Sequence, residues 1–175
     1  MAHIIVFMSE PEVWLRGPLD GYHPMLMPVA HSLLQVREDL TRLEHTVTSA
    51  QLWARPGGAA SIGFHIRHTG GALDRLLTYA RGEALSAPQL VFLAGEEASG
   101  DPPIPLSTLV IGVNAVIDRS LAQLRNTDPD RLLDVREVGR GRLPSTVLGL
   151  LVHAAEHSTR HLGQAITTAR ILSAR

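Results

Sequence analysis

The sequence predicts an all-α protein, a four-helix bundle, and two observations support this prediction. Four segments of the 175-residue chain repeat apolar residues at spacings of three and four, which is the periodicity of an amphipathic helix. The segments between them are rich in proline and glycine, and almost no stretch shows the two-residue alternation of a strand. A helix with one apolar stripe must bury it against another element, so four such helices are expected to pack together as one domain.

The first predicted helix covers residues 29–47, where apolar side chains recur at helical spacing and charged ones occupy the other side. Pro28 suits its first turn, because a proline there removes only an N–H that has no partner within the helix. Prolines and glycines interrupt the preceding chain. We therefore expect residues 1–23 to form an irregular lead-in and residues 24–175 to form the helical domain.

The second predicted helix covers residues 61–82 and stops at Gly82, since glycine favours the position after a helix. Gly70 and Gly71 lie inside it, although each glycine costs roughly 1 kcal/mol relative to alanine in a helix interior. Such a pair indicates a kink or the close approach of another backbone. Residues 83–106 hold further prolines and glycines and are expected to form mostly loop.

The third predicted helix starts near Ser107, a residue type that favours the N-cap, and ends before the turn at residues 126–129. Residues 134–143 alternate glycines with charged residues and are expected to form an extended loop or a short hairpin. Pro144 then opens the fourth helix, which we expect over residues 145–174.

Composition excludes several classes of function. The chain has no cysteine, which excludes disulfide frameworks, thiolate zinc sites, iron–sulfur clusters and cysteine nucleophiles. The net charge of −1 offers no basic excess to neutralise phosphates, so we expect no nucleic-acid partner. The apolar patch at residues 4–8 lacks a basic flank and a cleavage site, and no apolar run approaches the ~20 residues of a membrane span. We expect a soluble, cytoplasmic protein without a membrane partner.

Histidine is the unusual residue, with nine copies. Five of them form two clusters, which are His65 and His68 on the second predicted helix and His153, His157 and His161 on the fourth. Residues four apart lie on one face of a helix, so two imidazoles at this spacing can grip one metal ion. A third imidazole from the other helix would give a three-histidine site with a position open for water or substrate.

Helical periodicity separates these candidates only in part. At about 100° per residue, His157 and His161 form the inward pair on the fourth helix, whereas His153 leans toward solvent. Gln164 lies beside the inward pair. On the second helix the same arithmetic places His65 nearer the centre of the apolar face than His68, so periodicity alone prefers His65 as the third ligand.

A rival motif occupies the same place. The segment from His153 through Glu156 to His157 reads H-x-x-E-H, the signature of a metallopeptidase class in which both histidines bind zinc and the glutamate is the base. On a helix, however, Glu156 points away from the His157/His161 pair, which disfavours this interpretation. The remaining histidines have no assigned role: His3, His23, His31 and His45.

Two stretches carry a resemblance to a known family. One is SIGFHIRHTGGALDRLLTYARG at residues 61–82, and the other is LPSTVLGLLVHAAEHSTRHLGQ at residues 143–164, which ends in H-x-x-x-H-x-G-Q. With these stretches the chain resembles the DinB/YfiT-like superfamily of four-helix-bundle, metal-dependent enzymes. The resemblance covers roughly residues 24–172.

The resemblance implies an up-down-down-up four-helix bundle, often a homodimer, that binds divalent nickel or zinc through three histidines. Matched residue by residue, the ligands are His68, His157 and His161, with His65 and His153 as alternates. This differs from the periodicity preference for His65. We follow the motif, because a kink at the paired glycines would spoil a straight-helix projection. Gln164 is expected to hydrogen bond behind the ligands.

Members of the superfamily imply a reaction class but no substrate. Some resemble S-transferases and isomerases that use a low-molecular-weight thiol, and a bound metal lowers the pKa of that thiol. A metal-bound water would instead support hydrolysis. A small-molecule substrate follows in either case, and any thiol must come from outside this cysteine-free chain. The alternatives are a non-catalytic metal- or ligand-binding module, such as a sensor or stress-response protein, and a purely structural bundle, since fold and ligands do not fix a reaction.

Overall fold

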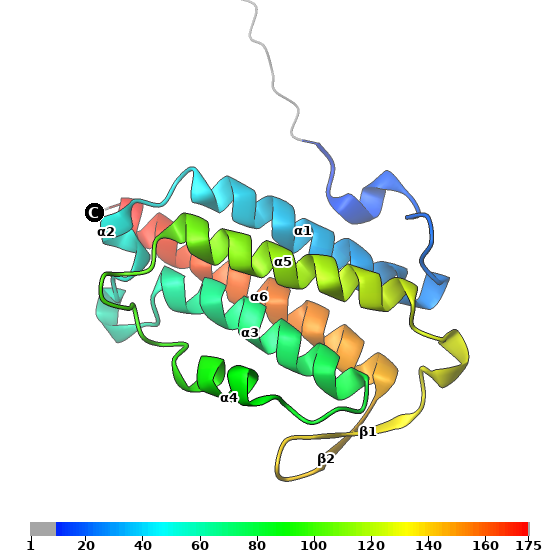
Figure 1. Ribbon diagram of the computed structural model, residues 1–175. Helices are drawn as coiled ribbons and strands as arrows, with labels where there is room; N and C mark the ends of the chain where they lie inside the picture. Colours follow the sequence, from blue (N-terminus) through cyan, green and yellow to red (C-terminus); the bar gives the residue numbers. More distant parts are fainter. Residues whose placement is uncertain (1–9, 175) are drawn as a thin grey trace, which may run out of the picture.

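The computed structural model describes residues 10–174, and within them the protein is mostly helical (Figure 1). Four long helices lie side by side, and shorter elements connect them. The long helices are α1 (Met27–Glu44), α3 (Ile62–Ala80), α5 (Leu106–Arg125) and α6 (Val147–Ser173). The shorter elements are α2 (Ser49–Leu52), α4 (Ala87–Ala94), β1 (Val135–Val138) and β2 (Leu143–Thr146). The helical class expected from the periodicity is confirmed, with one small antiparallel sheet added.

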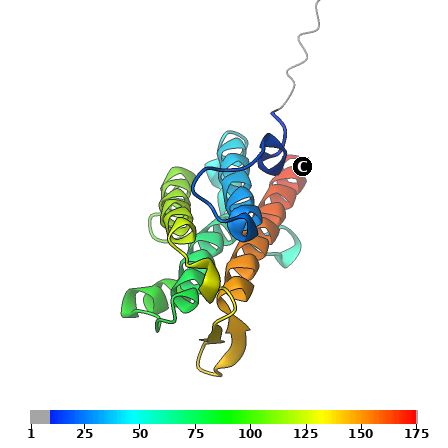
Figure 2. The same ribbon diagram turned by 90° about the vertical axis from the view of Figure 1, so that its right-hand side faces the viewer.

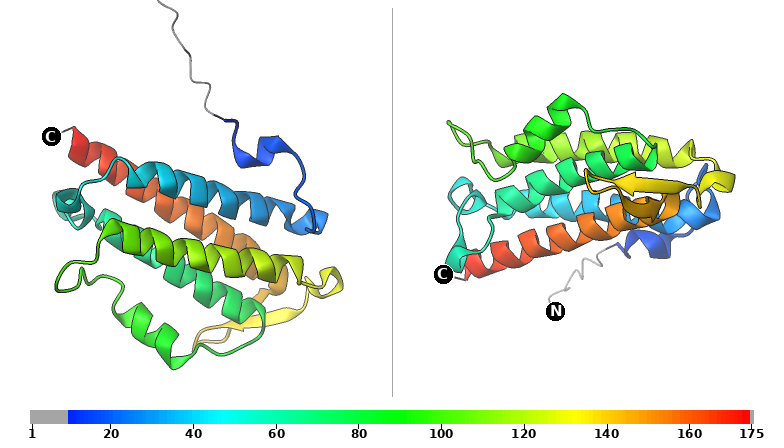
Figure 3. Two further views of the ribbon diagram at one scale, coloured as in Figure 1. Left: turned by 45° about the horizontal axis from the view of Figure 1, so that its top comes forward. Right: turned by 90° about the horizontal axis from the view of Figure 1, so that it is seen from below.

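The four long helices share one apolar core. Helix α3 packs against both α5 and α6, and α1 packs against the same two helices from the other side (Figures 2 and 3). Each helix contributes fully buried side chains, such as Leu33, Leu73, Ile117 and Leu151. Burying one side chain of this kind contributes about 1.5–3 kcal/mol, so the core fixes how α3 and α6 face each other. None of the helices in residues 10–174 is long and apolar enough to cross a membrane.

The fourth long helix begins later than the sequence suggests. Pro144 lies in β2, opposite Glu137 of β1, and the hairpin interpretation of residues 134–143 is confirmed. Helix α6 starts at Val147 because Thr146 is its N-cap, with the Thr146 hydroxyl accepting a hydrogen bond from the backbone N–H of Gly149 at 3.0 Å. The prediction that Pro144 opens this helix was wrong. A proline is tolerated in an edge strand, and both strands of a two-stranded sheet are edge strands.

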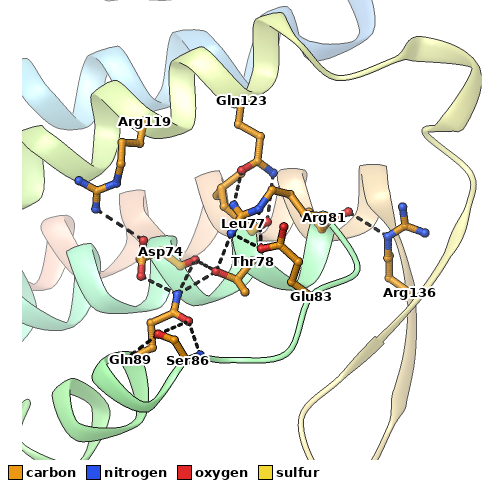
Figure 4. A network of polar contacts seen from close by, with 11 residues as sticks. Asp74, Leu77, Thr78, Arg81, Glu83, Ser86, Gln89, Arg119, Gln123 and Arg136 are labelled. Carbon is orange, nitrogen blue, oxygen red and sulfur yellow. Dashed lines mark hydrogen bonds and ion pairs between the residues drawn. The ribbon is translucent and has the colours of Figure 1, made fainter.

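The expected loop at residues 83–106 contains helix α4. Ser86 and Gln89 form a capping box at its start, a signal that the prolines and glycines around it obscured. The Gln89 amide also donates to the Asp74 carboxylate at 2.6 Å and to the Thr78 hydroxyl at 2.8 Å, which ties α4 to α3 (Figure 4). These hydrogen bonds hold α4 against α3, so the segment that follows α4 also lies over α3.

Two other predicted boundaries need correction. Helix α5 starts at Leu106 with Pro105 at its N-cap, so Ser107 lies inside the first turn and caps nothing. Helix α1 ends at Glu44, before the predicted end at residue 47, and a short turn leads from there to α2.

The paired glycines of α3 mark a close approach. Helix α3 is hydrogen-bonded without interruption from Ile62 to Ala80. A Cβ atom on Gly70 would lie 3.2 Å from Cγ2 of Val113 on α5, and one on Gly71 would overlap the carboxylate of Glu96. The glycines therefore let two neighbouring segments approach the α3 backbone, which are α5 at Gly70 and the segment that carries Glu96 at Gly71.

Candidate metal centre

Three histidines converge where α3 faces α6. His68 comes from α3, and His157 and His161 lie one turn apart on α6. One ring nitrogen from each lies within 4.8 Å of the others, and all three side chains are half-buried. Nε2 of His68 is 2.9 Å from Nε2 of His157, and the ring of His161 lies 4.5 Å from each of the other two rings. This spacing suits three ligands of one ion.

The surroundings of His157 and His161 disfavour their protonation. Burial, together with the neighbouring His68, lowers the pKa of His157 and of His161 to about 4 each. At neutral pH both rings therefore carry a lone pair, which is the form of histidine that binds metal.

Glu96, from the segment after α4, fixes the orientation of His68. Glu96 is 3% exposed, and its carboxylate accepts hydrogen bonds from Nδ1 of His68 at 2.7 Å and from Arg75 at 2.6 Å. Burial alone would raise the pKa of Glu96, but these hydrogen bonds and the charge of Arg75 hold the pKa below its usual range. With the Nδ1 proton donated to Glu96, the Nε2 lone pair of His68 faces His157.

Sequence reasoning missed Glu96. The residue stands in the segment expected to be loop, and its distance from the histidines along the chain gives no periodic signal. Gly71 was the one available hint, because a helix-interior glycine indicates that something approaches the backbone closely.

The two alternate ligands lie outside the group of three. His65 is 7% exposed, and its Nδ1 lies 3.1 Å from Nδ1 of His161. The His153 side chain is 52% exposed and points to Glu156, 3.5 Å away. The outward lean of His153 agrees with the helical projection.

The H-x-x-E-H interpretation gains no support from the geometry. The Glu156 side chain is 53% exposed and pairs with Arg160 at 3.2 Å on the outer surface of α6. Arg160 also donates to Nδ1 of His157 at 2.9 Å. Glu156 is thus turned away from the three rings, where it could not act as a base on a group bound there.

The other expected residues fall at the periphery. Gln164 is exposed on α6, while Glu96 accepts the hydrogen bond behind His68.

The histidines without an assigned role, where the structure describes them, lie away from the group of three. His31 contacts the carbonyl of Gly17 at 3.0 Å and holds the segment before α1 against that helix. His23 accepts from the Met25 N–H ahead of α1, and His45 follows the end of that helix. His3 and the apolar patch at residues 4–8 lie outside the described residues.

The fold and the site together define a helical protein with a three-histidine cluster between two of its long helices. The family model described as the DinB superfamily matches residues 32–165, and the chain belongs to that superfamily. The chain is also similar to a crystal structure described as the conserved protein of locus from Enterococcus faecalis. The TM-score is 0.63 at 19% identity, covering 86% of this chain and 98% of the other. At that identity the likeness shows the fold alone. No curated protein matches the sequence.

Proposed function

We propose that this protein is a metal-dependent enzyme in which His68, His157 and His161 hold one divalent ion, nickel or zinc. The observation that carries the proposal is the convergence of three imidazoles, with a buried carboxylate behind one of them. A neutral three-nitrogen donor set suits a borderline divalent ion and leaves positions open for water or substrate. Glu96 supplies the outer hydrogen bond that metal-binding histidines regularly make.

A divalent ion bound there would lower the pKa of a coordinated water or thiol, which supports either hydrolysis or S-transfer. The protein itself shields and orients the centre. Phe64 stacks on the ring of His68 with centroids 5.3 Å apart and lies edge-on to His161, so it covers one side with an apolar surface. Because the chain has no cysteine, the thiol of an S-transfer would be a low-molecular-weight cofactor or substrate.

Arg160 occupies the outer edge of the centre. Its guanidinium donates to Nδ1 of His157, so in this arrangement the proton of that ring sits on Nε2. Ligation through Nε2 of His157 therefore requires Arg160 to leave this contact. The Arg160 side chain is 51% exposed and can turn toward solvent, where it would offer a positive charge to an anionic part of the substrate.

Metal analysis tests the proposal. Purified protein is dialysed against nickel or zinc chloride and then buffer, and the bound metal is measured. We expect about one ion per chain in the wild type, loss of the ion in His157→Ala, and retention in the matched variant His153→Ala. Wild-type protein that retains no metal would contradict the proposal. If His153→Ala also lost the ion, the H-x-x-E-H interpretation would gain support.

A second candidate function is metal or ligand binding without turnover. Glu96 favours it, because this carboxylate is committed to His68 and Arg75 and offers no free base at the centre. Assays of metal-loaded protein with several low-molecular-weight thiols and electrophiles, and with ester and amide substrates, separate the two. Turnover that disappears in His157→Ala supports the enzyme, and a blank panel with tightly held metal supports the binding module.

We also propose the up-down-down-up topology and the homodimer that the family resemblance implies. In support of the topology, α1 and α6 run one way along the molecule and α3 and α5 run the other (Figure 1). In support of the dimer, α4 exposes the apolar side chains of Leu90, Val91 and Leu93, which a second copy would cover. Light scattering on the purified protein measures the oligomeric state, and a monomer would contradict the dimer.

A further inference from the structure

His65 is a buried histidine beside the proposed metal centre that the three-ligand site does not use. It lies one turn before His68 on α3, and its side chain reaches across to α6. Its Nδ1 lies 3.1 Å from Nδ1 of His161. This contact leaves the other ring nitrogen of His161, Nε2, available for an ion. The contact is within hydrogen-bond range, so a proton must lie on one of the two nitrogens.

The direction of this hydrogen bond decides whether His161 can bind an ion through Nε2. A histidine that binds a metal ion is a neutral ring with one N–H and one lone pair, so in this contact one ring donates from Nδ1 and the other accepts. If His65 donated, the proton of His161 would sit on Nε2 and block it. If His161 donates from Nδ1, its Nε2 lone pair is free to face His68 and His157.

We propose that His65 is a positioning residue rather than a ligand: its Nδ1 accepts the Nδ1 proton of His161 and holds that ring in the tautomer whose Nε2 can bind the ion. This inference rests on the proposed three-histidine site. His65 then plays for His161 the part that Glu96 plays for His68, so that two of the three ligands have a dedicated acceptor behind them.

Two replacements of His65 test this role. His65→Leu keeps apolar bulk but removes the acceptor, whereas His65→Asn can present its side-chain oxygen near the position of Nδ1. Zinc chloride is titrated into metal-free protein, with His153→Leu as the matched control at an exposed histidine. Because loss of such an outer partner costs about 10–100-fold in metal affinity, we expect that loss in His65→Leu, substantial recovery in His65→Asn, and no change in the control.

The wild-type protein gives an independent measurement if a variant fails to fold. Long-range ¹H–¹⁵N NMR of the zinc-loaded protein reports which nitrogen of each ring carries a proton. We expect a protected Nδ1 proton on His161 and a protonated Nε2 on His65. A His65 ring that coordinates zinc, a proton on Nδ1 of His65, or wild-type affinity in His65→Leu would each overturn the inference. Failure of wild-type protein to bind zinc would instead overturn the proposed function.

Discussion

Glu96 sits directly over Gly71, so closely that a Cβ atom on Gly71 would overlap its carboxylate. Gly71 and His68 lie one turn apart on α3, and Glu96 uses the space above the glycine to reach Nδ1 of His68 at 2.7 Å. A glycine that costs roughly 1 kcal/mol in a helix therefore makes room for the residue that orients a proposed metal ligand.

The first prediction compares two helix-interior glycines. Gly71→Ala should displace Glu96, lower the thermal stability and weaken zinc binding by about 10–100-fold, since the hydrogen bond behind His68 is lost. Gly112→Ala on α5 is the matched control, because a Cβ there meets nothing within 4 Å. We expect it to stabilise the protein by about 1 kcal/mol in denaturant unfolding and to leave zinc binding unchanged. Wild-type zinc affinity in Gly71→Ala would contradict this account of Glu96.

The second prediction concerns the buried charge pair of Glu96 and Arg75. Both residues are nearly inaccessible, at 3% and 8% exposure. Glu96→Gln should cost about 3–5 kcal/mol in the free energy of unfolding, because it leaves the Arg75 guanidinium buried without its counter-charge. The double variant Glu96→Gln/Arg75→Met should recover much of that loss. Its glutamine oxygen can still accept from His68, so its zinc affinity should exceed that of Glu96→Leu/Arg75→Met.

The contrast between His65 and His68 shows how far the sequence could lead. The helical projection placed His65 nearer the apolar centre, and His65 is indeed the more buried of the two. Burial does not determine ligation, however, because the Nδ1 of His65 is directed at His161 and only His68 joins the group of three. The family motif, and not the amphipathic pattern, therefore pointed to the residue that lies in the group of three, and the role of His68 as a ligand stays a prediction.

The elements that carry Glu96 could not be predicted in the same way. Apolar periodicity predicts the four long helices and the helix face on which His157 and His161 lie. Glu96 reaches the centre only because α4 is anchored to α3 through Gln89 and the chain then folds back over Gly71. Such a contact depends on tertiary packing, and the capping box of α4 was the local signal that could have revealed the helix.

The third prediction concerns the pH dependence of the metal-free protein. In the unfolded chain a histidine takes up a proton near pH 6.5, but His157 and His161 resist protonation in the folded protein until about pH 4. The unfolded state therefore binds more protons between these values, so the stability should fall as the pH drops from about 6.5 toward 4. Above pH 6.5 these two groups contribute no slope.

Denaturant unfolding of metal-free protein from pH 8 to 4.5 measures this effect. The stability linked to the lowered pKa of Glu96 is lost only as the pH falls below the ordinary glutamate pKa, so this range separates the histidines from Glu96. The variant His157→Gln/His161→Gln should show a flatter profile than the wild type between pH 6.5 and 4.5. Equal slopes in the two proteins would show that these histidines are not held neutral by the fold.

The fourth prediction is that Arg160 opposes metal binding. Its guanidinium donates to Nδ1 of His157 and places a positive charge beside a proposed ligand, so an ion must displace the hydrogen bond and work against the charge. Arg160→Ala should therefore bind zinc more tightly, on the order of several-fold, with a larger gain at low ionic strength because salt screens an exposed charge. Arg170→Ala, at an exposed position further along α6, is the matched control and should not change the affinity. Unchanged or weaker zinc binding in Arg160→Ala would contradict this account of Arg160.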